Sequence, residues 1–175
     1  MSKKNLIEKN ASEIRGGILN SALEVENELT ESIGYLYSKR NDEFSHFKLV
    51  EDIISDLTFD KKISILKKSI DFDFGIFKKY KSIIKDLNDI KEIRNQIAHR
   101  NISYPWIFDE DDIDENDYNF LTKNYVDWKE KCDFQKHGKE NFSFSLADLE
   151  SYQKKCELII IILRVGVGEL ISTKK

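Results

Sequence analysis

The chain has 175 residues, of which 40% are hydrophobic and 34% are charged, and its formal net charge is −4. This length allows one domain with a real core, over residues 1–175, but not two cores of ordinary size. The composition is typical of a soluble globular protein. The negative balance argues against a protein that coats nucleic acid nonspecifically, although RNA stays open as a substrate.

Targeting, membrane and metal signals are weak along the chain. Residues 1–9 are polar and charged, without the apolar core of a signal peptide. The longest apolar run, residues 158–163, is too short to span a bilayer. Cys132 and Cys156 show no C-x-x-C spacing, so neither a disulfide framework nor a zinc site is expected. We expect a cytoplasmic protein with reduced cysteines, no membrane contact, no metal and no cofactor.

Residues 10–38 are predicted to form a long first helix, because apolar residues recur with a period near 3.6. Gly16 and Gly17 interrupt this pattern. They indicate a kink or a close helix crossing, with an approach of the backbone to a ligand as the alternative. Glu24, Glu26 and Glu28 belong mostly to a solvated face. One of them is a candidate to turn towards the cations described below, since a buried cation needs a partner.

A second helical region is predicted in two pieces, residues 47–55 and 59–70, with Asp56 and Thr58 as candidate caps of the later piece. Lysines gather from here to the start of the next helix: Lys61, Lys62, Lys67, Lys68, Lys78, Lys79, Lys81 and Lys85. Such a run is usually a solvated face. Aromatic residues are interleaved with it, which would also suit the stacking of unpaired bases. Lys78, Lys79, Lys81 and Lys85 are therefore weak candidates for RNA binding.

Residues 81–101 are predicted to form an amphipathic helix with one apolar stripe, made of Ile83, Ile84, Leu87, Ile90, Ile93 and Ile97. Arg94, Asn95 and His99 arrive together in its last turn and a half. The helix is expected to end before Pro105. A polar cluster of this kind can handle a phosphate group.

The spacing of these three residues decides how they can cooperate. Asn95 and His99 are i,i+4 neighbours on one face. At about 100° per residue, Arg94 lies roughly 140° around the axis from His99 and about 7.5 Å along it. One helix cannot easily bring both onto a small target, whereas a second copy related by a two-fold axis completes the set. We therefore predict a homodimer with a composite site.

An insertion is predicted at about residues 102–145. Residues 102–108 are aromatic, and residues 109–117 form an acidic run without the spacing of an EF-hand loop. The run is interpreted as a solvated loop, or alternatively as an electrostatic cover for the site when RNA is absent. Residues 118–133 and 141–145 alternate enough to predict a β-hairpin turned near His137, with two phenylalanines, Phe142 and Phe144, on one face.

The last helix is predicted over residues 146–172, with Ser145 as its N-cap and Asp148 three residues later. Because residues 158–163 are apolar on nearly all sides, this helix is expected at the centre of the bundle or at a subunit interface.

The hexapeptide Arg94-Asn95-Gln96-Ile97-Ala98-His99 resembles the R-x4-6-H signature, in its R-N-x-x-A-H form, of the HEPN superfamily. The similarity extends to the order of the helices: a long first helix, a second that opens near residues 57–63, the signature helix and an apolar last helix. The resemblance implies an all-α fold, an antiparallel helical bundle with a small inserted β-hairpin before the last helix. It also implies a metal-independent endoribonuclease, as a toxin or phage-defence effector whose partner is an antitoxin or a regulatory protein.

The residues fit this chemistry. A neutral His99 imidazole is suited to take the proton of a ribose 2′-hydroxyl, because histidine titrates near neutral pH. Arg94 is suited to stabilise charge on phosphoryl oxygens, and Asn95 to orient the imidazole or an oxygen. Alternatively, the three residues only bond the exposed carbonyls of the last helical turn. The superfamily includes noncatalytic, mannitol-repressor-like modules, so a dimeric interaction or regulatory module is the alternative function.

Overall fold

The computed structural model describes residues 3–38, 43–71, 80, 82–103, 131–135 and 142–173. Its helices are α1 (Lys3–Tyr37), α2 (Glu43–Leu49), the π-helix η1 (Val50–Ile54), α3 (Phe59–Asp71), α4 (Ile83–Ala98) and α6 (Leu146–Thr173). Its strands are β1 (Asn101–Ser103), β2 (Lys131–Gln135) and β3 (Phe142–Ser145). The prediction of a mainly helical chain with a small β-element before the last helix is confirmed.

The chain groups into two compact units, whose boundaries fall inside α1, α4 and α6. Unit 1 contains Met1–Leu19 and Arg94–Tyr152, and unit 2 contains Asn20–Ile93 and Gln153–Lys175. The prediction of one domain over residues 1–175 stays a prediction. Among the described residues, no helix combines the length and the apolar character that crossing a membrane requires.

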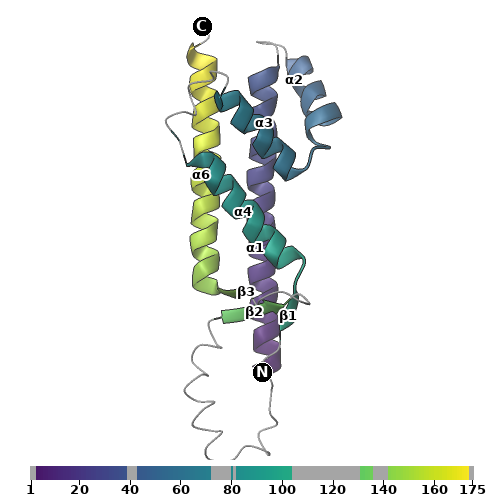
Figure 1. Ribbon diagram of the computed structural model, residues 1–175, viewed down its shortest axis with the longest axis vertical. Helices are drawn as coiled ribbons and strands as arrows, with labels where there is room; N and C mark the ends of the chain where they lie inside the picture. The colour runs from purple at the N-terminus through teal and green to yellow at the C-terminus, as the bar shows by residue number, and fades with distance from the viewer. Residues whose placement is uncertain are drawn as a thin grey trace, which may run out of the picture. The chain divides into compact units, whose positions relative to one another are not determined.

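The sheet of unit 1 is antiparallel with the strand order β1-β2-β3 (Figure 1). Ile102 of β1 faces Phe134 of β2, and Phe134 in turn faces Phe142 of β3. Phe134 is completely buried, so the middle strand supplies the apolar centre of this small sheet. Large aromatic side chains contribute most to such a core because they remove the largest apolar area from water.

The predicted hairpin strands are present as β2 and β3, and the predicted residues 118–130 lie outside the described residues. The rings of Phe142 and Phe144 stack with centroids 5.6 Å apart, which confirms that they share one strand face. The prediction missed β1, because three residues that directly follow a helix carry too short a pattern to be recognised. The acidic run at residues 109–117 and the turn residue His137 lie outside the described residues.

The start of α6 is fixed by a reciprocal cap. The backbone N–H of Ser145 donates to Asp148 Oδ2 at 2.8 Å, and the N–H of Asp148 donates to Ser145 Oγ at 3.0 Å. Two amides that the helix leaves unpaired are thereby satisfied, and the predicted N-cap is confirmed. Close by in unit 1, a Cβ on Gly17 would lie 2.8 Å from Leu149 Cδ1. Since α1 continues through this position, the glycine serves a close helix crossing.

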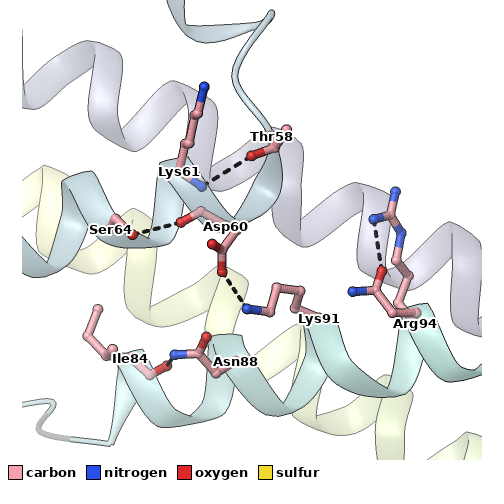
Figure 2. A network of polar contacts seen from close by, with 9 residues as sticks. Thr58, Asp60, Lys61, Ser64, Ile84, Asn88, Lys91 and Arg94 are labelled. Atoms are coloured by element: carbon pink, nitrogen blue, oxygen red, sulfur yellow. Dashed lines mark hydrogen bonds and ion pairs between the residues drawn. The ribbon is translucent and has the colours of Figure 1, made fainter.

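Unit 2 buries apolar faces of α1, η1, α3, α4 and α6 against one another, including Leu29, Ile33, Ile54, Leu66, Leu87, Ile90, Ile159 and Leu163. The predicted cap of α3 is confirmed at Thr58, whose Oγ1 accepts the Lys61 N–H at 3.4 Å (Figure 2). Lys62 is buried rather than part of a solvated basic face. Its Nζ pairs with Glu26 Oε1 at 3.2 Å, which gives the buried cation the counter-charge it needs.

A second ion cluster in unit 2 joins α6 to α4. Lys155 Nζ lies 2.9 Å from both Asp86 Oδ1 and Asp89 Oδ2. Burial is the largest single influence and acts to raise the pKa of Asp86, but the hydrogen bonds from Lys155 and Ser82 and the charges of Lys155 and Lys85 together lower it. A carboxyl with a lowered folded-state pKa stabilises the fold above its ordinary pKa of 3.8 and loses that contribution as the pH falls through the lowered value. This cluster is therefore expected to weaken only in strong acid.

Gly34 is predicted to be essential for the packing of α2 and η1 on α1. A Cβ at this position would lie 2.5 Å from Val50 Cγ2 and 2.7 Å from His46 Cε1. We expect Gly34→Ala to lower the free energy of unfolding by about 1–3 kcal/mol, because the added methyl group overpacks the contact. Urea denaturation followed by circular dichroism measures this.

The matched control for this prediction is Gly16→Ala in the same helix. A Cβ on Gly16 meets no atom within 4 Å, so the change should stabilise the helix by about 0.5–1 kcal/mol through helix propensity alone. Equal effects of the two substitutions would show that the close approach at Gly34 contributes nothing to stability.

Candidate functional site

The signature residues lie where α4 ends. The apolar stripe of this helix is buried at Ile83, Leu87, Ile90 and Ile97, whereas Ile84 and Ile93 are half-buried. Helical spacing puts Arg94 on the same face as the buried Ile90 and Ile97, whereas Asn95 is turned about 100° away from it. Both side chains are half-buried. His99 follows Ala98, the last helical residue, and its side chain is exposed. Its backbone N–H donates to the Asn95 carbonyl at 3.4 Å, so the turn continues the helical hydrogen bonding.

The guanidinium of Arg94 has one described contact, in which Nη1 donates to the side-chain oxygen of Asn95 at 3.4 Å (Figure 2). This is a long hydrogen bond, and it joins two neighbours in the sequence. Because a guanidinium has five N–H donors, most donors of Arg94 are left for a ligand. The Asn95 amide was predicted to orient the imidazole or a phosphate oxygen. In the structure its oxygen accepts the hydrogen bond from Arg94.

The imidazole of His99 is exposed, and it forms no hydrogen bond, ion pair or ring contact with another described residue. The three glutamates that were candidates to hold the cluster lie in unit 2. Glu26 pairs with Lys62, and Glu28 Oε2 accepts from Arg164 Nε at 2.8 Å. Glu24 is exposed. The described partners of Glu26 and Glu28 are thus other cations than Arg94.

Arg100, which was not predicted to be a site residue, is the arginine that secures this end of α4. It is only 8% exposed, and its Nε donates to Gln96 Oε1 at 2.8 Å. Its Nη1 donates to the Phe134 carbonyl of β2 at 3.3 Å, and its guanidinium carbon lies 5.8 Å from the centre of the Phe142 ring. The i,i+4 spacing of Gln96 and Arg100 was the sequence signal for this contact.

A second missed cation, Arg15, reaches the same turn from α1. Its Nη2 donates to the Arg100 carbonyl at 2.6 Å, and its guanidinium carbon lies 5.6 Å from the centre of the Phe134 ring. The sequence carried no signal for this residue, because it lies 85 positions before its partner in a helix with many charges. Three arginines, 15, 94 and 100, therefore belong to the unit that holds His99.

Of the four lysines predicted weakly to bind RNA, the structure describes one. Lys85 on α4 is exposed, whereas Lys78, Lys79 and Lys81 lie outside the described residues. Lys61, Lys67 and Lys68 on α3 are also exposed. Lys85, which belongs to unit 2, therefore stays a candidate for RNA binding.

Cys132 and Cys156 are both buried, and no disulfide joins them. Burial raises the pKa of the Cys132 thiol, and the neighbouring Asp133 carboxylate adds to the shift. A protonated thiol is a poor nucleophile, so Cys132 is a packing residue of β2. Among the described residues, no group of three or more His, Cys, Asp or Glu side chains is arranged to hold a metal ion.

Comparisons with protein-family models, with curated proteins and with solved structures gave no match for this chain. The resemblance to the HEPN superfamily therefore rests on the signature residues and on the order of the helices.

Proposed function

We propose that the protein is a metal-independent endoribonuclease in which Arg94, Asn95 and His99 form the active site. The observation that carries this proposal is the different bonding of two arginines that lie six residues apart at the end of α4. Arg100 is buried and bonded to a carbonyl and to Gln96, whereas Arg94 keeps most of its donors and His99 is exposed. A cluster that only capped the helix would have Arg94 bonded to the last carbonyls.

The proposed reaction needs one base and one cation. The neutral imidazole of His99 takes the proton of a ribose 2′-hydroxyl, and the 2′-oxygen attacks the adjacent phosphorus. The bond from phosphorus to the 5′-oxygen breaks, and that oxygen takes a proton from water as it leaves. The products are a 2′,3′-cyclic phosphate and a 5′-hydroxyl end. Arg94 stabilises the charge that develops on the phosphoryl oxygens, which is where a planar fork of donors acts best.

The test of this function is cleavage of a labelled RNA by the purified protein in excess chelator. We expect cleavage with cyclic phosphate ends, and no cleavage at a position where the ribose is replaced by 2′-deoxyribose. The deoxy position is the matched control, because it keeps the sequence and the phosphate but removes the attacking group. Cleavage at the deoxy position would contradict the proposed mechanism.

The composite site makes a separate prediction for mixed dimers. If each site takes Arg94 from one copy and His99 from the other, a dimer of one Arg94→Ala chain and one His99→Ala chain keeps one intact site. Mixing the two inactive variants in equal amounts, with exchange of subunits, should restore about a quarter of the wild-type activity. A mixture as inactive as its components would place both residues of a site on one chain, and light scattering would report whether a dimer forms at all.

A second candidate function is a noncatalytic dimeric HEPN-like module, mannitol-repressor-like, that acts through protein contacts. It is favoured by the apolar side chains that unit 2 exposes on α6, namely Leu158, Ile161 and Val165. An enzyme of the proposed kind would act as a toxin or in phage defence, restrained by an antitoxin or a regulatory protein. Absence of cleavage across several RNAs, together with a stable dimer, would favour the module.

A further inference from the structure

Arg15 is a half-buried cation to which the structure gives no carboxylate partner among the described residues. Its Nη2 donates to the Arg100 carbonyl at 2.6 Å, and its Nε is buried without a hydrogen-bond partner. Of five N–H donors, the described contacts therefore use one. Keeping a positive charge half-buried without a counter-ion costs free energy, which an anion from outside the chain would offset.

The position of Arg15 relates it to the proposed active site. The carbonyl that it binds belongs to the residue after His99, and consecutive Cα atoms are about 3.8 Å apart. Both residues belong to unit 1. An RNA strand carries a phosphate on every nucleotide, so a strand with one phosphodiester at His99 has further phosphates on either side of it.

The orientation of the guanidinium is set on two sides. The Phe134 ring lies 5.6 Å from its central carbon, and the Arg100 carbonyl holds one Nη group. Because Nε is buried, an anion approaches through the remaining Nη donors. The planar fork of an arginine matches phosphate oxygens better than the single point charge of a lysine would. Arg100 differs, since its described bonds to Gln96 and to Phe134 make it a residue that holds the turn.

We propose that Arg15 binds a phosphate of the RNA strand that flanks the phosphodiester at His99. This inference rests on the proposed ribonuclease function, for which it adds a backbone contact on a second helix. The ligand class is a phosphodiester of single-stranded RNA, recognised without regard to base sequence. It goes beyond the signature hexapeptide, which does not include Arg15.

The test measures RNA binding, so that it does not depend on catalysis. A short single-stranded RNA is titrated with the His99→Ala protein at several salt concentrations in chelator. Adding Arg15→Gln should weaken binding about tenfold at low salt, the loss of one charged hydrogen-bonding group. It should also make the slope of log affinity against log salt shallower by about 0.7, the value for one lost phosphate contact.

Two further variants control this experiment. Arg15→Lys keeps the charge, so the salt slope should return to the parent value while affinity stays lower because the fork is lost. Arg164→Gln removes a surface arginine of unit 2 and should leave the slope unchanged. If Arg15→Gln leaves the slope unchanged but speeds amide exchange at residues 99–101, Arg15 only braces the turn and the proposal is overturned.

The failure of this inference and the failure of the proposed function are distinguishable. A slope that depends on Arg15 in a protein whose wild type cleaves no RNA would keep the phosphate contact and reject the enzyme. Chelator-resistant cleavage by the wild type, with a slope independent of Arg15, would keep the enzyme and reject the phosphate contact.

Discussion

His99→Ala should lower the rate of RNA cleavage by about 10²- to 10⁴-fold, the usual contribution of a positioned general base. The reason is chemical, because alanine cannot accept the proton of the 2′-hydroxyl. Since the His99 side chain is exposed, the free energy of unfolding should change by no more than about 0.5 kcal/mol. Single-turnover cleavage and urea denaturation of the same preparation measure the two quantities.

His46→Ala is the matched control for this substitution, with the opposite expected pattern. The His46 imidazole bonds to Glu31 Oε2 at 3.0 Å through Nε2, and its ring stacks on Tyr35 with centroids 4.0 Å apart. Its removal should lower the free energy of unfolding by about 1 kcal/mol and leave the cleavage rate unchanged. If His99→Ala unfolds the protein while His46→Ala does not, the signature turn is structural and the enzyme proposal fails.

Lys62→Met should destabilise the protein strongly. The side chains of Lys62 and Glu26 are only 5% and 16% exposed, and their charged atoms lie 3.2 Å apart. Removing the cation leaves a largely buried carboxylate without a partner, which we expect to cost about 2–4 kcal/mol of stability. Chemical denaturation of wild type and variant gives the difference directly.

Two variants show whether the loss comes from the ion pair. Lys61→Met changes the neighbouring lysine, whose side chain is exposed and points away from Asp60 (Figure 2), and should stay within about 0.5 kcal/mol of wild type. The double variant Lys62→Met with Glu26→Gln should recover most of the stability, because no buried charge is left unpaired. A double variant as unstable as Lys62→Met would assign the loss to packing of the lysine stem.

The position of the helices was predictable because their signals are local. The stripe of α4, the Ser145 cap of α6 and the Thr58 cap of α3 all depend on residues within one or two turns, and each is present. Strand β1 was missed because it depends on a distant partner: its pairing with β2 joins Ile102 to Phe134. A three-residue strand is specified by its partner and not by its own sequence.

The candidate site also has a part that local sequence predicts and a part that depends on distant residues. Sequence by itself placed Arg94, Asn95 and His99 at one helix end, because helical spacing fixes neighbours over a few residues. The sequence did not distinguish the arginine that holds the turn from the arginines whose N–H donors have few described partners. That distinction came from tertiary contacts: Arg100 is hydrogen-bonded to groups of α4 and β2, while Arg15 reaches the turn from α1. Burial and hydrogen-bond partners depend on segments distant in the chain, and these decide which charged side chains are left to bind a ligand.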